Sequence, residues 1–355
     1  MRIGIPREIK AMEGRVAMIP EACKQLLGAG HAVIIEQGAG ALSGYDDECY
    51  AKLGVELASG PSELYAAAQL ILKVKEPQAS ELALLNSDHL LFSFLHLAAE
   101  PALGRRLQEI GLTAVAFETV EEASDRLPLL APMSDIAGRI AAQVGTCLLH
   151  QSHGGKGLLL GGLPAADRGR VIIIGAGTAG GNAAVLAAAA GAEVVVFDIN
   201  RDRLAAMRAL GNNVTGLYPY EDAVAREVSR ADIVIGAVLK TGARAPHVVT
   251  RQMISTMQAG GVVIDISVDQ GGCVETTRPT TYENPTYKEE GVIHFAVTNM
   301  PGAVPRSASQ ALSAALLPYV LVLAEPDWKS CKPLTRGINI EAGEVIHPAL
   351  KETFA

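Results

Sequence analysis

The sequence has few of the features that mark membrane-spanning or nucleic-acid-binding proteins. Aromatic residues make up only 4% of the 355 residues, and the formal net charge is −8. A chain with this charge offers no extended basic surface for phosphates, which argues against a nucleic-acid partner. The longest apolar run, residues 311–324, contains Pro318 and is too short to cross a bilayer. We interpret it as part of a helix, residues 309–324, that returns to the first domain or packs against a neighbouring subunit.

Cysteine is also scarce. The five cysteines are scattered, odd in number and without Cys-x-x-Cys spacing: Cys23, Cys49, Cys147, Cys273 and Cys331. This pattern indicates neither a disulfide framework nor a zinc site, so we expect no metal and a reducing, cytoplasmic location. The N-terminus reaches Pro6, Arg7 and Glu8 before a signal-like apolar region could develop, so no export is expected.

Aliphatic residues and glycine dominate what is present. Hydrophobic residues make up 49% of the chain, charged residues 19%, and there are 36 glycines. This composition is typical of α/β proteins, and the length predicts two domains, each large enough for its own core.

Short β-branched runs alternate with helical stretches in the first third. Strands are predicted at residues 3–5, 32–36, 70–74, 90–94 and 113–117, and helices at residues 20–27 and 102–110. Such spacing predicts a parallel sheet. Ser134 is a good helix N-cap, and a long helix is predicted over residues 135–150, followed by a glycine-rich stretch at residues 154–162. We expect the chain to cross between domains near this segment.

A second alternation predicts a nucleotide-binding domain of the six-strand Rossmann type. Its strands are expected at residues 171–174, 194–197, 233–235, 262–266 and 293–297. The predicted class is therefore α/β, with two domains that each hold a parallel sheet flanked by helices. We place the first part of the substrate domain at residues 1–128, the Rossmann domain at 129–305, and a segment returning to the substrate domain at 306–355.

A glycine motif, Gly175-Ala-Gly177-Thr-Ala-Gly180, follows an apolar strand and opens an alanine-rich helix. The bare pattern is weak, but the strand, the helix and an acid at the end of the next strand favour a dinucleotide site over an empty glycine turn. Gly175 would permit the tight turn, Gly177 would let the backbone approach a pyrophosphate, and Gly180 would let the helix lie close to the strand.

The acid is Asp198. It is expected to accept hydrogen bonds from a ribose and to repel a 2′-phosphate, which favours NAD over NADP. Arg201 and Arg203 act against this inference, because either could reach a phosphate, although both also suit the solvated first turn of a helix.

Four polar residues end predicted elements in the substrate region: Arg15, Lys75, His96 and Asp269. Lys75 and His96 follow strands, and open parallel sheets bind ligands at the carboxyl ends of their strands. Each residue also has a purely structural interpretation. Arg15 and Lys75 could be surface charges, His96 a hydrogen-bonded core histidine, and Asp269 a turn carboxylate.

The order of several short motifs resembles the alanine dehydrogenase/pyridine nucleotide transhydrogenase family, and its alanine dehydrogenases in particular. The matching segments are MRIGIPREIK (1–10), EGRV (13–16), KVKEP (73–77), FLHLA (94–98), LLAPMS (129–134), IGAGTAG (174–180), IGAVL (235–239), IDISVDQGGC (264–273) and VTNMP (297–301). The similarity covers nearly the whole chain.

This resemblance implies reversible NAD-dependent oxidative deamination of L-alanine to pyruvate and ammonium by a hexamer. Arg15 and Lys75 would hold the substrate, His96 would exchange protons with it, and Asp269 would orient water or ammonia. His96 and Asp269, from different domains, would face the same substrate carbonyl. The positions where the family binds NAD correspond to Ser134, Gly175, Gly177, Thr178, Ala179, Gly180, Asp198, Arg203, Val238, Leu239, Ile266, Ser267, Val268, Asp269, Arg278, Val297, Thr298, Asn299 and Met300.

Two alternatives remain at this point. The nucleotide-binding subunit of a proton-translocating transhydrogenase shares the fold and the glycine motif, but lacks the histidine of the FLHLA segment and needs a membrane partner. A dehydrogenase of the lysine or saccharopine type shares the two-domain plan but needs room for a longer side chain.

Overall fold

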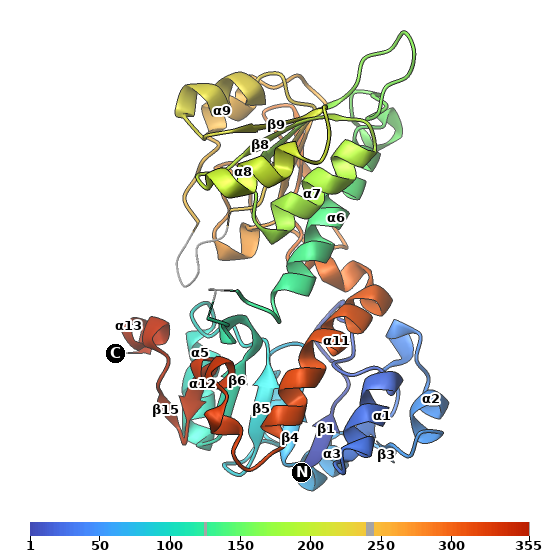
Figure 1. Cartoon of the computed structure of the whole chain (residues 1–355), viewed down its shortest axis with the longest axis vertical. Coiled ribbons are helices and arrows are strands. Elements are labelled where there is room, and N and C mark those ends of the chain that lie inside the picture. Colours follow the sequence, from blue (N-terminus) through green and yellow to red (C-terminus); the bar gives the residue numbers. More distant parts are fainter. Residues whose placement is uncertain (124–125, 239–244, 355) are drawn as a thin grey trace. The chain divides into compact units, whose positions relative to one another are not determined.

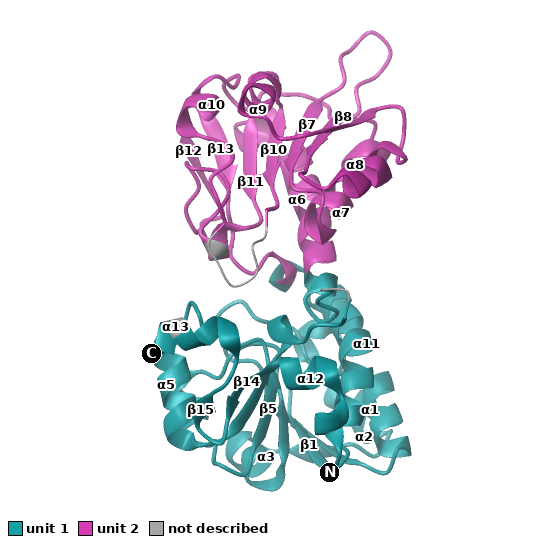
Figure 2. Cartoon of the chain, turned by 60° about the vertical axis from the view of Figure 1, so that its left-hand side comes forward, with its two compact units in different colours: residues 1–133, 302–355 teal, residues 134–301 magenta. Residues whose placement is uncertain are grey.

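The computed structural model describes residues 1–123, 126–238 and 245–354, and the chain forms two compact units. Unit 1 comprises residues 1–133 and 302–355, and unit 2 comprises residues 134–301 (Figure 2). The boundaries expected from the sequence fell after residues 128 and 305. The chain changes unit inside helix α6 (Ala131–Leu148), so the crossing lies near the start of this helix and not at the glycine-rich stretch.

Unit 1 contains an eight-stranded sheet with the order β15-β14-β6-β5-β4-β1-β2-β3 (Figure 1). Its strands are β1 (Arg2–Ile5), β2 (Ala32–Glu36), β3 (Glu56–Ala58), β4 (Leu70–Leu72), β5 (Leu90–Ser93), β6 (Thr113–Ala116), β14 (Ile338–Glu341) and β15 (Glu344–Val345). The first six run parallel to one another, whereas β14 is antiparallel to both of its neighbours, β6 and β15. The parallel sheet expected for this domain is therefore confirmed for these six strands, and two antiparallel strands that the sequence did not predict extend it at one edge.

Helices cover the sheet of unit 1. They are α1 (Pro20–Gly28), α2 (Asp47–Ala51), α3 (Pro61–Ala67), α4 (Ala79–Leu82), α5 (Pro101–Ile110), α11 (Pro305–Leu323), α12 (Lys332–Arg336) and α13 (Lys351–Phe354). Leu64, Leu91 and Leu107 belong to a core that joins α3, β5 and α5.

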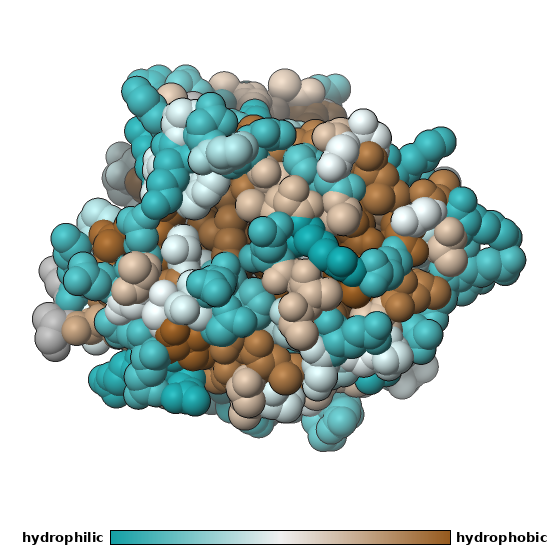
Figure 3. Space-filling view, turned by 90° about the horizontal axis from the view of Figure 1, so that it is seen from below, coloured by the Kyte–Doolittle hydropathy of each residue, from teal (hydrophilic) through white to brown (hydrophobic). Residues whose placement is uncertain are grey.

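The face of the molecule shown in Figure 3 carries apolar residues interspersed with polar ones.

Helix α11 belongs to unit 1 and packs beside α1, as the first of the two sequence interpretations expected (Figure 1). Two buried serines interrupt its apolar face. The Oγ of Ser309 accepts a hydrogen bond from the Val16 amide (2.9 Å), and the Oγ of Ser313 accepts one from the Ile19 amide (3.1 Å). The returning helix therefore fixes the backbone that follows Arg15.

Unit 2 contains a seven-stranded sheet with the order β12-β13-β11-β10-β7-β8-β9. Its strands are β7 (Arg170–Ile174), β8 (Glu193–Phe197), β9 (Val214–Leu217), β10 (Ile233–Gly236), β11 (Val262–Asp265), β12 (Thr286–Glu289) and β13 (Val292–Phe295). Of these strands in the described part of unit 2, only β12, at the edge, is antiparallel to its neighbour. Besides α6, the helices are α7 (Thr178–Ala189), α8 (Arg201–Arg208), α9 (Glu221–Val228) and α10 (Arg251–Ser255).

Alternate side chains of β7 face opposite sides of the sheet of unit 2. Ile172 and Ile174 pack in a core with α9 and α10. A Cβ added to Gly180 of α7 would lie 3.2 Å from Ile173, so α7 covers the other face. Helices on both faces make this a doubly wound unit.

Both units share one strand order. Read from β3 to β6 and from β9 to β13, each sheet has the order 3-2-1-4-5-6 of a Rossmann fold. The order reverses between β1 and β4 in unit 1 and between β7 and β10 in unit 2. Open sheets of this kind bind ligands at the carboxyl ends of the two strands beside the reversal.

Among the described residues, no helix is both long and apolar enough to span a membrane.

Candidate functional site

The glycine motif lies at the reversal point of unit 2. Gly175 has φ +100°, in the left-handed region that favours glycine, and its amide donates to the Phe197 carbonyl (2.7 Å). A Cβ on Gly180 would lie 1.8 Å from the Gly175 oxygen, whereas a Cβ on Gly177 would have nothing nearer than an Arg203 nitrogen at 4.0 Å. The turn and the close helix contact expected from the sequence are thus confirmed, and Gly177 leaves open space before α7.

Asp198 is buried and lies beside this turn. Its Oδ2 accepts from the Ala176 amide (2.7 Å), and its Oδ1 accepts from the Asn200 amide (2.7 Å). The carboxylate therefore fixes the glycine turn, a role that the sequence did not indicate. Arg203 places Nη1 at 3.9 Å from Asp198 Oδ2, and half of its side chain is exposed, so the solvated-turn interpretation is only partly right.

The neighbouring strand ends of unit 2 carry most of the other expected cofactor positions. Val238 follows β10, Ile266 to Asp269 follow β11, and residues 297–300 follow β13. Leu239 lies outside the described residues. The Ile266 amide donates to the Gly236 carbonyl (2.8 Å), which keeps these strand ends in register.

Two expected cofactor residues have surroundings that the sequence did not predict. Ser134 is not an N-cap, because α6 begins three residues earlier at Ala131. Pro132 explains the difference, since proline is well suited to the first helical turn. The Arg278 guanidinium stacks on the Tyr287 ring, 4.0 Å from its centroid.

Asp269 is exposed and lies in a single 3₁₀ turn, η4 (Val268–Gln270). The turn is organised by Asp265, a fully buried carboxylate that the sequence analysis missed. Asp265 accepts from the amides of Ser267 (3.0 Å) and Cys273 (2.9 Å) and from the Thr277 hydroxyl (2.8 Å). Burial raises the pKa of Asp265, although these hydrogen bonds oppose the rise. The loop that presents Asp269 is therefore closed around a structural acid.

Arg15 lies in unit 1, in the segment after β1, and only 2% of it is exposed. The surface-charge interpretation is therefore wrong. Its Nε donates to Glu13 Oε1 (2.6 Å) and its Nη2 to Glu13 Oε2 (2.5 Å), while Nη1 contacts Met133 Sδ (3.0 Å). This bidentate ion pair with Glu13 fixes the plane of the Arg15 guanidinium.

Lys75 follows β4, the other strand beside the reversal point of unit 1. It is half-buried, and its amide and that of Val74 donate to Glu8 (3.4 and 2.6 Å). Burial and then the positive charge of Arg15 lower the pKa of Lys75. An ammonium group destabilised in this way is well suited to gain an anionic partner.

A buried ionic cluster supports the Lys75 backbone, and sequence reasoning missed it. Lys73 Nζ donates to Glu81 (2.6 Å) and to Glu8 (3.3 Å), and the Tyr65 hydroxyl donates to Glu81 (3.1 Å). Burial alone would lower the pKa of Lys73, but the two carboxylates raise it. The KVKEP segment therefore contains one structural lysine and one lysine at the edge of the sheet.

His96 follows β5 with φ +51°, a backbone conformation that is strained for a residue with a Cβ. Glu118 stabilises it by accepting from the His96 amide (2.6 Å), and His96 Nδ1 lies 3.9 Å from the same carboxylate. The imidazole stacks on Phe94 at 5.7 Å, and 37% of the side chain is exposed. The core-histidine interpretation is therefore wrong: the ring is held with one part open to solvent.

Lys75 and His96 follow two adjacent strands of unit 1, β4 and β5. The Phe94 amide donates to the Val74 carbonyl (3.2 Å). Val74 directly precedes Lys75, and Phe94 lies two residues before His96. Arg15, Lys75 and His96 thus gather at the carboxyl edge of unit 1, where a cation, a second cation and an acid-base group can act on a small carboxylate.

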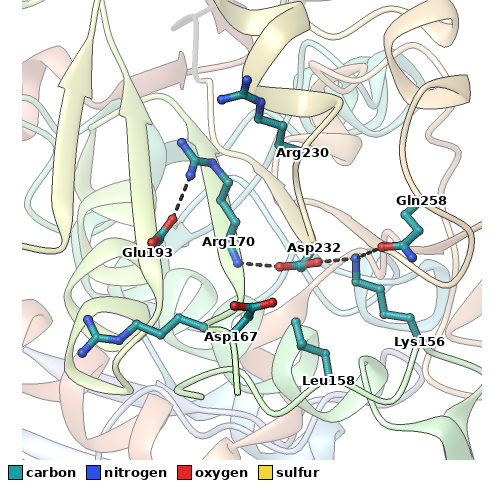
Figure 4. Close-up of a pocket in the computed structure, with 9 residues that line it drawn as sticks. Lys156, Leu158, Asp167, Arg170, Glu193, Arg230, Asp232 and Gln258 are labelled. Atoms are coloured by element: carbon teal, nitrogen blue, oxygen red, sulfur yellow. Dashed lines mark hydrogen bonds and ion pairs between the residues drawn. The ribbon is translucent and has the colours of Figure 1, made fainter. Parts of the chain in front are cut away.

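A polar pocket of about 510 Å³ lies at the opposite, amino edge of the sheet of unit 2 (Figure 4). Its charges largely neutralise one another: Arg170 donates to Glu193 (2.8 Å), and Lys156 pairs with Asp232. The pocket is far along the strands from the glycine turn and contains none of the residues expected to bind a cofactor.

Comparisons with known proteins agree with this geometry. The family model described as alanine dehydrogenase/PNT, N-terminal domain, matches residues 4–137, and the model for the C-terminal domain matches residues 141–348. An alanine dehydrogenase from Halomonas elongata is 44% identical over 100% of the chain and 97% of its own length. One from Bacillus subtilis is 44% identical over 99% of the chain and 94% of its own length.

Solved structures give the same result. A structure titled L-alanine dehydrogenase has a TM-score of 0.96 and 44% identity, covering 100% of this chain and 99% of that one. A transhydrogenase from Sinorhizobium meliloti has a TM-score of 0.85 and 25% identity, covering 98% and 100%. The resemblance seen in the sequence is confirmed: the chain belongs to the alanine dehydrogenase/PNT family.

Proposed function

We propose that the chain catalyses the reversible, NAD-dependent oxidative deamination of L-alanine to pyruvate and ammonium. The observation that supports this most strongly is 44% identity to alanine dehydrogenases along the whole chain. His96 adds to it, because the transhydrogenase alternative is expected to lack this histidine.

The residues at the reversal point of unit 2 fit a dinucleotide. The open space at Gly177 and the first amides of the 12-residue helix α7 suit a pyrophosphate. Asp198 suits an unphosphorylated ribose, so NAD is proposed over NADP. When bound, the nicotinamide supplies hydride acceptance and donation.

The polar residues of both units supply the remaining chemistry. Arg15 and Lys75 bind the substrate carboxylate and carbonyl side through charge-assisted hydrogen bonds. His96 exchanges a proton with the substrate nitrogen or oxygen, and Asp269 orients water or ammonia. Glu13, Glu118 and Asp265 act through these residues, as positioning groups.

The proposal is tested by incubating the purified chain with a panel of L-amino acids and either NAD or NADP, and following absorbance of the reduced cofactor. L-alanine with NAD is expected to give the highest kcat/KM. Lysine-dependent turnover would favour the saccharopine-type alternative. If no amino acid reduces the cofactor, but hydride is exchanged between two nucleotides, the transhydrogenase alternative would be favoured.

The glycine motif gives a matched pair of variants. Gly177→Ala is expected to fold normally, because its Cβ meets open space, but to weaken NADH binding by roughly 10- to 150-fold, the cost of about 1.5–3 kcal/mol for one hydrogen bond to a charged group. Gly180→Ala is expected to lower both thermal stability and NADH affinity, because its Cβ would clash with the Gly175 oxygen. NADH fluorescence titration and thermal melting measure the two effects, and equal melting of both variants would contradict this assignment.

Cofactor choice provides another prediction. Asp198→Ala combined with Ile199→Arg is expected to lower kcat/KM for NAD and to raise it for NADP, because a repelling carboxylate is exchanged for a cation. Ile199 is exposed, so its replacement is tolerated. The single Ile199→Arg variant controls for the added charge. A wild-type preference for NADP would show that the role given to Asp198 is wrong.

We further propose that the chain assembles as a homohexamer in the cytoplasm. The outward side of α11 carries partly exposed apolar residues, and all five cysteines are thiols, the state expected in a reducing compartment. Light scattering coupled to size-exclusion chromatography measures the mass. A monomeric or dimeric mass would contradict the assembly.

A further inference from the structure

Three metal-binding side chains gather where helix α6 ends, away from the proposed chemistry. They are Cys147, His150 and His153, all exposed, and one ligand atom from each lies within 4.8 Å of the others. Cys147 Sγ lies 3.9 Å from either ring nitrogen of His153. The absence of Cys-x-x-Cys spacing argued against a zinc site, but one cysteine can also bind zinc together with histidines.

The backbone explains why these residues share one face. The His150 amide donates to the Cys147 carbonyl (3.1 Å), and the His153 amide donates to the His150 carbonyl (3.0 Å). His150 is extended (φ −69°, ψ 142°) and joins the end of α6 to a single 3₁₀ turn, η3 (Gln151–His153), so two tight turns follow each other here. The spacing Cys-x-x-His-x-x-His therefore brings three ligands together on two successive turns.

Glycines allow the tight geometry of this turn. Gly154 has φ +85°, and a Cβ on Gly155 would lie 2.1 Å from the Leu148 oxygen. The Gly157 amide donates to the Leu149 carbonyl (2.8 Å), which ties the following segment back to α6. Ligands on a backbone fixed in this way lose little freedom when an ion binds.

We propose that Cys147, His150 and His153 bind a borderline transition-metal ion, with Zn²⁺ as the expected occupant. One thiolate and two imidazoles are ligands that zinc favours over Ca²⁺ or Mg²⁺. Bond lengths of about 2.3 Å to sulfur and about 2.1 Å to nitrogen bring tetrahedral ligands to about 3.6 Å from one another. The Cys147–His153 separation of 3.9 Å is close to this value, and His150 lies within 4.8 Å of both, so rotation of the exposed side chains brings the three ligands to bonding distance of one ion.

The surroundings also favour a cation. The site lies at the carboxyl end of α6, an 18-residue helix, where the helix dipole is negative. Binding transfers the Cys147 thiol proton to solvent, because the thiolate is the ligand, and water completes the fourth position.

The site is separate from the proposed cofactor residues. Gly145 of α6 packs against Ile233, which begins β10, and Lys156 bonds to Gly260, which precedes β11. The Cys147, His150 and His153 cluster therefore lies toward the amino edge of the sheet of unit 2, whereas the glycine turn lies at the carboxyl edge. Turnover and NADH affinity are expected to be independent of these three residues.

The test is a titration of the full, chelator-stripped chain with Co²⁺ and then Zn²⁺. One equivalent of Co²⁺ is expected to give a sulfur-to-cobalt charge-transfer band that Zn²⁺ removes. Cys147→Ala is expected to abolish the band, and His150→Ala and His153→Ala to weaken Zn²⁺ binding by roughly tenfold or more, or about 1.4 kcal/mol. Cys49→Ala and His247→Ala, also at exposed positions, serve as controls and are expected to bind like the wild type.

A second measurement needs no variant. Zn²⁺ is expected to protect Cys147, but not exposed Cys49, from alkylation, as read by peptide mass spectrometry. Equal protection of both cysteines, absence of the charge-transfer band, or wild-type zinc affinity in Cys147→Ala would overturn the proposal. Because NADH affinity is measured alongside, failure here is distinct from failure of the proposed dehydrogenase activity.

Discussion

Replacing Lys75 with alanine is expected to abolish measurable turnover of L-alanine while NADH binding stays close to that of the wild type. The ammonium group is proposed to contact substrate and not dinucleotide, and truncating one partner of a buried charged hydrogen bond costs about 2–5 kcal/mol, or roughly 30-fold to 5,000-fold. Steady-state kinetics and NADH fluorescence titration measure the two quantities. Lys24→Ala, an exposed lysine on α1, is the matched control.

The lowered pKa of Lys75 adds a pH dependence. A lysine with a depressed pKa loses its charge at a lower pH than a free lysine does. As the pH rises, the pyruvate affinity of the NADH complex is therefore expected to fall before pH 10.5, the ordinary pKa of lysine, is reached. Lys75→Arg should move this loss to higher pH, because arginine stays charged. A fall in NADH affinity together with activity in Lys75→Ala would contradict the assignment to substrate binding.

His96→Ala is expected to lower kcat by roughly 10²- to 10⁴-fold, the usual range for losing a positioned acid-base group. The fold and the NAD affinity should be preserved, because 37% of the side chain is exposed and its support from Glu118 runs through the backbone amide. Rapid-mixing kinetics measures kcat, circular dichroism measures the fold, and fluorescence titration measures the affinity for the cofactor. His247→Ala is the control.

Asp269→Asn is expected to have a similar effect on kcat. Because His96 and Asp269 are proposed to serve the same proton-transfer sequence, the double variant should lose less than the product of the two single losses. Multiplicative losses would mean independent roles. Unchanged kcat in either single variant would remove that residue from the mechanism.

The glycine turn could be predicted from the sequence because its geometry is local. A left-handed Gly175 and a helix touching the turn at Gly180 follow from three fixed positions after an apolar strand. The central strands of both sheets were predictable for the same reason, since buried parallel strands are almost continuously apolar.

The edge strands were not predictable. Strand β12 reads Thr-Tyr-Lys-Glu, with no apolar alternation, and β14 joins the sheet by pairing with β6, more than 200 residues earlier. Such strands depend on contacts that no short window of sequence contains.

The supporting acids were also missed. Nothing local distinguishes Asp265 from Asp269, yet one is fully buried and organises the loop while the other is exposed. Likewise Lys73 and Lys75 differ by only two positions, but Lys73 is neutralised by nearby Glu81 and by Glu8, which the fold brings from a distant segment. The residues proposed to meet substrate were recognisable from motifs, whereas the residues that hold them required the fold.

Direct hydride transfer from alanine to NAD is the central claim, and isotope tracing tests it most directly. The chain is incubated with L-alanine deuterated at Cα and with unlabelled NAD, and the reduced cofactor is analysed by mass spectrometry. The account predicts one deuterium in each NADH formed by the wild type, and none above background with Lys75→Ala. Unlabelled NADH, or no NADH from L-alanine at all, would contradict it.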